Sequence, residues 1–345
     1  MADTHDNAKQ SSLLWRILKW LRLPLVAFIF FFIFRRIDFQ ELKSSITGIA
    51  WWTIPLVIGV NTFAVFLQGV RIWVLIRAFS NSISLLKALK YHFVSAFYSL
   101  ILPSSIAQDV VRAVLFTRHI DYSIAWSATW VFKLTFVCTW VLFSAIGLVF
   151  LEEDVISVQV KQIILIAMGV TLISVFLSFN KRITAPIRGL LTGKIPKKVQ
   201  NAAENIRQGV FNYRNRKRYL VAGMGITLFL QLNLVLGSGV ILYGTTGKWY
   251  LIELFALIPI IDIITIIIPL TPQSIGVREA LFAVMFERAG LTKEEAALFI
   301  LVNVFSYTSK LFGGIPALYD IIVRPSDSIA GREVLTRAKE SSSHP

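Results

Sequence analysis

The sequence of 345 residues contains few charged side chains and only one cysteine. Charged residues make up 16% of it, against about 25% in soluble globular proteins, while hydrophobic residues make up 55%. Cys138 has no second cysteine to pair with, which excludes an intrachain disulfide. The sequence also lacks a glycine-rich phosphate loop, a catalytic triad and the residue spacing of a metal site. These absences argue against a soluble enzyme, and they predict no catalytic residue, no cofactor and no metal.

Long hydrophobic stretches stand where a soluble protein would carry charges. A helix that crosses a membrane needs about 20 apolar residues, and the clearest candidates are residues 49–70, 122–150, 163–179, 219–243 and 296–323. A sixth stretch ends at residue 34. It is long enough only if its helix begins near residue 13 and its basic side chains extend to the lipid surface. The composition therefore predicts a multi-pass helical membrane protein with about six full spans.

Two further apolar segments, 85–102 and 250–270, each run into a break rich in proline, serine and threonine. The breaks contain Pro103 in the first segment and Pro269 and Pro272 in the second. Because the residue before a proline disfavours the helical conformation, we expect each segment to reverse there and form a re-entrant hairpin. Irregular backbone at membrane depth requires surrounding protein or a water-filled cavity, so the hairpins should line an interior cavity.

The distribution of lysine and arginine predicts the orientation. If the N-terminus is cytoplasmic and both hairpins return to the side they entered from, eight of the 35 basic residues face outward and two lie inside spans. The other 25 fall on the cytoplasmic side, as the positive-inside rule requires, and the loop 181–218 is the most basic piece. The net charge of +15 thus indicates contact with anionic lipid headgroups and not with nucleic acid. We predict a protein of the cytoplasmic (inner) membrane with both termini inside.

The two breaks resemble each other. Pro-Ser-Ser-Ile-Ala at 103–107 aligns with Pro-Gln-Ser-Ile-Gly at 272–276, and each is followed closely by an acidic residue and an arginine. The next full span of each half contains a lysine within its apolar stretch, first Lys133 and then Lys310. Because the predicted hairpins enter from opposite sides, this is an inverted-topology repeat. Such repeats place a binding site between two broken helices near the bilayer midplane.

The predicted fold is an all-α polytopic integral membrane protein with about six full spans and two re-entrant helical hairpins in an inverted-topology repeat. Its single transmembrane domain covers residues 13–325, with repeat halves at 49–180 and 219–325 joined by the basic loop 181–218. Residues 1–12 and 326–345 are polar, and we expect them to be disordered. Apolar residues in the loop have the spacing of an amphipathic helix, which would lie on anionic lipid or form a solvated connector.

These motifs resemble those of a known family, the flippase-like transmembrane region of lysylphosphatidylglycerol synthases. Residues 103–112 read Pro-Ser-Ser-Ile-Ala-Gln-Asp-Val-Val-Arg, similar to the family pattern Pro-x-x-x-Gly-Gly-Asp-x-x-Arg. Residues 269–279 read Pro-Leu-Thr-Pro-Gln-Ser-Ile-Gly-Val-Arg-Glu, similar to Pro-x-x-Pro-Gly-Gly-x-Gly-x-x-Glu. Lys133 and Lys310 stand where the family usually has arginine. The resemblance covers residues 15–325 and implies a stand-alone lipid translocase, because no segment remains for the aminoacyl-transferase domain of the synthases. Four glycines of the pattern are replaced here, by Ala107, Gln108, Gln273 and Ser274.

Ionisable residues near the breaks are the candidates for substrate binding or gating. Asp109 and Arg112 are three residues apart, on one helical face, and can pair. Ser105 with Gln108 fits a capping box at the start of the second arm, whose free N–H groups would hold an anion such as a lipid phosphate. The alternative is a structural ion pair that closes the hairpin.

Lysines inside spans need partners, because each costs about 2.5–3.5 kcal/mol near the bilayer centre. We expect Lys133 and Lys310 to meet Asp109 or Glu279, within one repeat or across the two, either to bind a headgroup or as purely structural pairs. Gly276, three residues before Glu279, would let the backbone approach a ligand closely. Asp262 and Glu253 are weaker candidates. The full set of predicted site residues is Asp109, Arg112, Lys133, Arg278, Glu279, Lys310, Ser105 and Ser274, with hairpin breaks at Pro103, Pro269, Pro272 and Gly276.

The function predicted from these features is translocation of an anionic or headgroup-modified lipid through a midplane cavity. One alternative is a membrane-embedded transferase acting on a lipid phosphate or polyprenyl phosphate, with Asp109 or Glu279 as base. Another is an accessory subunit of an enzyme of envelope lipid biosynthesis. The predicted partners are membrane lipids with anionic headgroups and no nucleic acid; a partner enzyme and a homo-oligomer both remain open.

Overall fold

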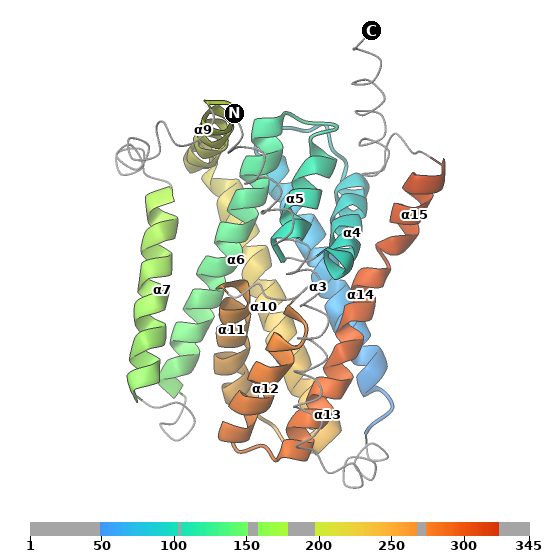
Figure 1. Cartoon of the computed structure of the whole chain (residues 1–345), viewed down its shortest axis with the longest axis vertical. Helices are drawn as coiled ribbons and strands as arrows, with labels where there is room; N and C mark the ends of the chain where they lie inside the picture. Colours follow the sequence, from blue (N-terminus) through green and yellow to red (C-terminus); the bar gives the residue numbers. More distant parts are fainter. Residues whose placement is uncertain (1–48, 103–104, 151–157, 179–196, 268–273, 324–345) are drawn as a thin grey trace, which may run out of the picture.

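The computed structural model of the chain describes residues 49–102, 105–150, 158–178, 197–267 and 274–323. All regular structure in these ranges is helical (Figure 1). Four helical stretches in them are long and apolar enough to cross a membrane, and each coincides with a predicted span. They are α3 (Thr53–Ile76), α6 (Tyr122–Phe150), α10 (Lys217–Thr246) and the stretch Lys293–Asp320, which contains α13 and α14.

The remaining predicted segments are covered in part. Helix α7 (Val158–Ser178) takes up the apolar stretch predicted at 163–179. The stretch that ends at residue 34 lies outside the described residues, as do the two chain ends predicted to be disordered. The count of six spans and the single-domain boundaries therefore stay predictions.

Helix α3 is longer than the apolar stretch that predicted it. The stretch ends at residue 70, before Arg71, whereas the helix continues to Ile76. It does so because Ile72 and Leu75 are buried on the same side as the arginine, whose own side chain is fully buried. Arg71, which follows the apolar stretch and belongs to the 25 basic residues assigned to the cytoplasmic side, is therefore an interior residue.

Two pairs of shorter helices occupy opposite ends of the molecule. Helices α4 (Leu85–Ile101) and α5 (Ser105–Phe116) lie in the upper half of Figure 1, and α11 (Leu251–Ile267) and α12 (Val277–Arg288) lie in the lower half. Helix α4 ends where Leu102 turns extended, with ψ 143°, as expected for a residue before a proline. Pro103, Pro269 and Pro272 lie outside the described residues, but the helices end on either side of them.

The two halves pack crosswise. Helix α11 packs against α6, the helix that follows the first pair, while α4 packs against α14 (Thr308–Leu311) and α15 (Gly314–Val323), which follow the second pair. Glycine permits the closest approach on each side, as small residues do between membrane helices. A Cβ on Gly147 of α6 would overlap Ala256 of α11, and one on Gly313 would overlap the carbonyl of Phe93 in α4.

The last predicted span, 296–323, is not one regular helix. Helix α13 (Lys293–Val304) passes into a 3-10 turn at Phe305–Tyr307, and a further turn at residues 312–313 separates α14 from α15. The second turn coincides with the close approach of Gly313 to α4. Lys310 lies in α14, between these two interruptions.

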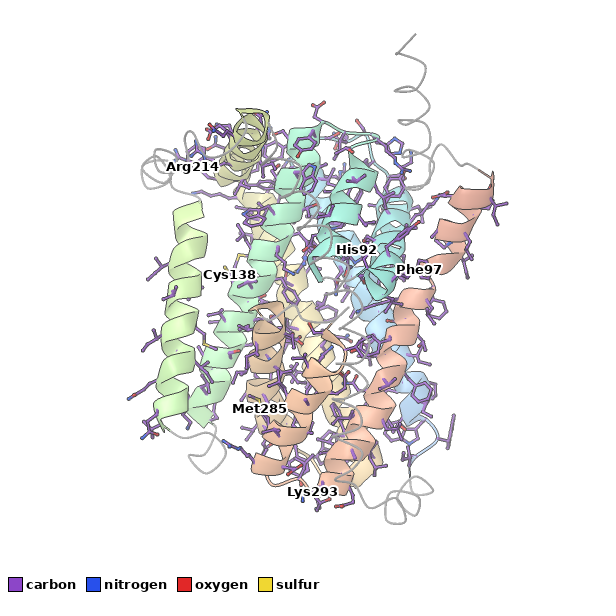
Figure 2. The ribbon with its side chains drawn as sticks, viewed as in Figure 1. His92, Phe97, Cys138, Arg214, Met285 and Lys293 are labelled. Carbon is purple, nitrogen blue, oxygen red and sulfur yellow. The ribbon has the colours of Figure 1, made fainter. Side chains whose placement is uncertain are left out.

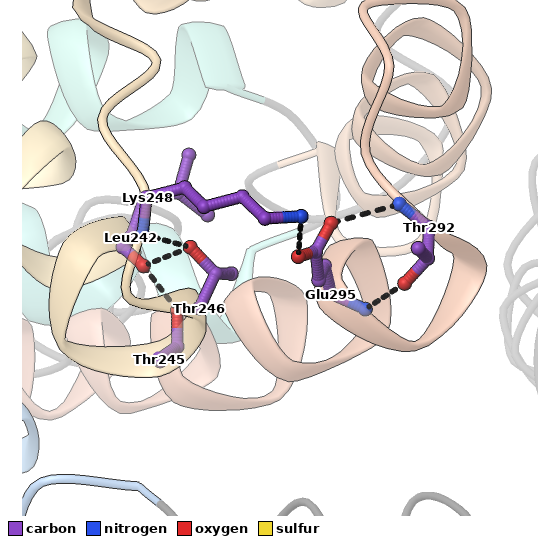
Figure 3. Close-up of polar contacts among 6 residues, drawn as sticks. All are labelled: Leu242, Thr245, Thr246, Lys248, Thr292 and Glu295. Atoms are coloured by element: carbon purple, nitrogen blue, oxygen red, sulfur yellow. Dashed lines mark hydrogen bonds and ion pairs between the residues drawn. The ribbon is translucent and has the colours of Figure 1, made fainter.

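At the lower end of the molecule a polar network joins α10 to α13 (Figure 3). Helix α10 ends at Thr246, and the capping residue Gly247 has a left-handed φ of 72°. The next residue, Lys248, donates to Glu295 at 2.8 Å, and this carboxylate raises the pKa of the lysine. Glu295 also accepts from the backbone N–H of Thr292 at 2.9 Å, while the Thr292 hydroxyl accepts from the Glu295 N–H, a complete capping box.

At the other end the basic loop contains helix α9 (Lys197–Asn212), which is amphipathic as predicted. In its described part the apolar side packs on the bundle, where Val210 and the following Tyr213 are buried. The Tyr213 hydroxyl donates to the carbonyl of Leu75 at 2.9 Å, and burial raises its pKa. The helix therefore closes one end of the bundle. Figure 2 shows Arg214, just after it, at the end opposite to Lys293.

Candidate functional site

A cavity of about 220 Å³ lies between the two helix pairs and is lined from both halves of the chain. Six ionisable side chains line it: Asp109, Arg112, Lys133, Asp262, Arg278 and Lys310. Neutral polar side chains complete much of the wall: Asn61, Gln68, Gln108, Thr265, Ser274 and Ser309. Six of the eight predicted site residues thus meet at one cavity.

The first half contributes a cluster around Asp109. Its carboxylate bonds to the guanidinium of Arg112, one turn further along α5, which confirms the predicted pair. It also lies 3.5 Å from the Nζ of Lys133 in α6, so this lysine meets one of its two expected carboxylates, in the same half of the chain. One carboxylate therefore neutralises part of the charge of two cations.

The second half uses a different carboxylate. Asp262 in α11 lies 3.3 Å from the guanidinium of Arg278 in α12, which ties the two arms of this pair together. Asp262 is a weaker candidate than Glu279 by sequence, yet it is the acidic residue of this half that lines the cavity. Lys310 also lines the cavity, with its Nζ 5.4 Å from the centre of the Tyr307 ring.

Glu279 is buried next to the cavity but is not among the residues that line it. One carboxylate oxygen accepts from the backbone N–H of Gly276 at 2.6 Å, and the other accepts from the Tyr307 hydroxyl at 2.9 Å. These contacts hold the first turn of α12 against the 3-10 turn. The position at a helix N-terminus suits a carboxylate, so the residue has a structural task here.

Ser274, which stands where the family pattern has a glycine, adopts a backbone conformation that favours glycine. Its φ is 57°, in the left-handed region, and Gly276 two residues on has a φ of 88°. The buried Ser274 hydroxyl donates to the carbonyl of Thr265 at 3.1 Å, which holds this strained serine against α11. Ser105 begins α5, but its side chain lies outside the described part.

The wall of the cavity carries an excess of positive charge. Four of its ionisable groups are basic and two are acidic, so the lining has a net charge of +2 when all are ionised. In a cleft with low-dielectric walls the electric field of such a charge is focused, so the cavity attracts anions. No group of three or more potential metal ligands occurs in the residues that the structure describes.

Three polar residues of α3 near the site are absent from the predicted set of site residues. Asn61 and Gln68 line the cavity, and Asn61 donates to the carbonyl of Val57 in its own helix at 2.8 Å. Arg71 directly follows the apolar stretch 49–70, a position typical of a residue at the end of a span and not of an interior residue. Its spacing from Ala64 and Gln68, seven and three residues, puts it on the same helix face and was the available signal. Gln231 of α10, by contrast, bonds between helices and donates to the hydroxyl of Thr139 in α6 at 2.7 Å.

The sequence matches a known family over most of its length. The family model described as lysylphosphatidylglycerol synthase TM region matches residues 19–308, a range that contains every charged residue of the cavity except Lys310. No curated protein sequence matches the chain.

Proposed function

Because the chain belongs to the family of lysylphosphatidylglycerol synthase transmembrane regions, we propose that it translocates an anionic or headgroup-modified lipid across the cytoplasmic membrane. Membership of this family supports a role in lipid metabolism or transport at a membrane. The observation that carries the proposal is the cavity, in which ion clusters from the two helix pairs meet and leave an excess of positive charge.

The proposed topology has six spans and two re-entrant hairpins of opposite sense, with both termini cytoplasmic. Its support is the length of the paired helices. Helices α4 and α11 have 17 residues each and rise about 25 Å, and α5 and α12 have 12 residues each and rise about 18 Å. All four fall short of the roughly 30 Å of a hydrocarbon core. Tips that meet from opposite ends would put the cavity near the midplane.

In the proposed cycle the headgroup enters the cavity while the acyl chains stay in the bilayer. The volume of about 220 Å³ is below the ~300–1,000 Å³ of pockets that enclose drug-sized ligands, which suits a headgroup and not a whole lipid. Lys133 and Lys310 are the cations that would contact the anion. Asp109 and Asp262 hold neighbouring cations in place when no ligand is bound.

The rival enzymatic function has less support from the same contacts. Asp109 is engaged by two cations, and Glu279 accepts two hydrogen bonds, so neither carboxylate is placed as a base. Mass spectrometry of lipids incubated with the purified protein separates the two functions, because a transferase changes lipid masses and a translocase does not.

The direct test is movement of a fluorescent anionic lipid between leaflets of proteoliposomes, measured by quenching the outer leaflet. We expect the wild-type protein to move the lipid and Lys133→Gln and Lys310→Gln to abolish movement without loss of folding. The matched control is Lys248→Gln, an exposed lysine at the lower end, which should transport normally. Normal transport by both cavity variants would refute the proposal.

A further inference from the structure

Behind the wall of the cavity lies a further cation, Arg71, in addition to the four that line it. The side chain of Arg71 in α3 is 0% exposed, and its Nη1 donates to the hydroxyl of Thr227 in α10 at 2.8 Å. Its Nε and Nη2 are buried and have no hydrogen-bond partner in the ranges that the structure describes. No salt bridge links this guanidinium to a carboxylate among those residues. A buried cation of this kind is costly unless an anion accompanies it.

Arg71 shares an aromatic ring with a cation of the cavity. Its Cζ lies 3.5 Å from the centre of the Phe132 ring, and the Cζ of Arg112 lies 3.9 Å from the same centre. The side chain of Arg112 is 1% exposed, and its Nε also lacks a partner within the described residues. Two buried guanidinium groups therefore face one ring, and Asp109 bonds to only one of them.

A buried histidine belongs to the same group. His92 in α4 is 0% exposed, and its ring centre lies 5.9 Å from that of Phe132. Neither ring nitrogen has a hydrogen-bond partner in the described part of the chain. Figure 2 places this residue in the upper half of the molecule, among the helices of the first pair. It adds a donor to a region that is already rich in unused N–H groups.

The position of these groups connects them to the cavity. Phe132 and Arg112 line it, and Arg71 follows the cavity residues Ala64 and Gln68 at seven and three positions along α3. Residues at this spacing share a helix face, so Arg71 continues the polar wall one turn deeper. Phe132 forms part of the wall between the cavity and the Arg71 guanidinium.

We propose that Arg71 and Arg112 form a phosphate subsite at the inner end of the cavity. Guanidinium groups bind phosphate through pairs of parallel N–H donors, and the unused Nε and Nη2 of Arg71 are such a pair. The phosphate comes from a lipid headgroup or from inorganic phosphate, and it reaches the subsite when the Phe132 ring turns aside. If the phosphate belongs to a lipid headgroup, this inference rests on the proposed function. It then adds that Arg71 and Arg112 bind the phosphate of the translocated lipid.

The test is calorimetric titration of the full-length protein in detergent with two probes, dioctanoyl phosphatidic acid and inorganic phosphate. Arg71→Gln should weaken binding of the lipid probe by about tenfold or more, the usual loss for a hydrogen bond to a charged group. Arg77→Gln, an exposed arginine at the end of the same helix, should bind like the wild type. Binding of both probes, or of the lipid alone, with this dependence supports a headgroup subsite. Binding of inorganic phosphate alone assigns the subsite to the free ion and overturns its lipid form.

The control for correct folding is Arg71→Lys. Lysine keeps the positive charge and most of the side-chain volume, but it lacks the planar guanidinium with its parallel N–H donors. The wild-type Tm should rise with the lipid probe, and the rise should be lost in the lysine variant although its ligand-free Tm is close to that of the wild type. Wild-type affinity in both Arg71 variants would overturn the subsite. Lys133→Gln separates the two proposals: if it loses binding while the Arg71 variants keep it, the cavity stands and the subsite falls.

Discussion

Asp109 lies 3.5 Å from the Nζ of Lys133 and bonds to Arg112 as well, so a single carboxylate links α5 to α6 and balances two cations. The second half solves the same problem with Asp262, which bridges α11 and α12 through Arg278. The two halves thus contain similar charged residues but pair them differently. In the first half the ion pair of Asp109 with Lys133 connects α5 to the next helix, α6. In the second half the ion pair of Asp262 with Arg278 connects the two helices of the pair, α11 and α12.

Replacing the carboxylate of Asp109, which two cations share, should lower the stability of the protein. Asp109→Asn leaves Arg112 and Lys133 without their counterion. Removing one partner of a fully buried pair costs about 3–5 kcal/mol, and the cost here should be smaller because Asp109 is 19% exposed. We expect a clearly lower Tm in detergent. The double variant Asp109→Asn with Arg112→Gln should recover part of the loss, since one uncompensated cation is gone. A single variant as stable as the wild type would show that the carboxylate is not needed to hold the cations.

Glu279 should behave as a structural residue. Glu279→Gln can supply only one carbonyl oxygen where the carboxylate serves both Gly276 and Tyr307, so one buried donor loses its acceptor. The expected cost is about 1–3 kcal/mol, seen as a lower Tm. Affinity for the anionic lipid probe should stay at the wild-type level in the folded fraction, because the residue does not line the cavity. Lost binding with an unchanged Tm would instead give this carboxylate the ligand contact predicted from the sequence.

The close approach of α4 to the last helices predicts intolerance of a methyl group. Gly313→Ala places a Cβ against the carbonyl of Phe93, a backbone atom that cannot move aside like a side chain. Overpacking of this kind costs about 1–3 kcal/mol, measured as the Tm in detergent. Gly59→Ala in α3 is the control, because nothing lies within 4 Å of its Cβ position, and its Tm should stay equal or rise. Equal Tm values for the two variants would contradict the packing described for Gly313.

The sequence predicted those parts of the fold that depend on local chemistry. Pro103 ends α4 through the restriction it places on Leu102, and the spacing of Asp109 and Arg112 makes their pairing nearly automatic on a helix. The two lysines inside apolar stretches pointed to a shared interior, and both line the cavity. These features need no knowledge of distant contacts.

The misplaced features depend on tertiary contacts. An arginine after an apolar stretch is typical of the end of a span. Only the hydrogen bond of Arg71 to Thr227 in α10 and its position over the Phe132 ring show that it is an interior residue. Asp262 ranked low because its partner, Arg278, lies across a break in the chain. The apolar face of α9 has the pattern of a lipid-binding helix, and its docking on Leu75 through Tyr213 is not encoded in that pattern.

The central claim is that the two helix pairs enter from opposite sides and return, and labelling of single engineered thiols tests it most directly. The substitutions, in a Cys138→Ser background, are Asn81→Cys and Asp121→Cys, which flank the first pair, and Lys248→Cys and Arg288→Cys, which flank the second. Each position is exposed. With a membrane-impermeant maleimide on oriented vesicles, we predict that the first two thiols react only from the cytoplasmic face and the last two only from the outer face. If either pair of flanking thiols reacts from opposite faces, that helix pair crosses the membrane, and the shared cavity between two re-entrant hairpins does not exist.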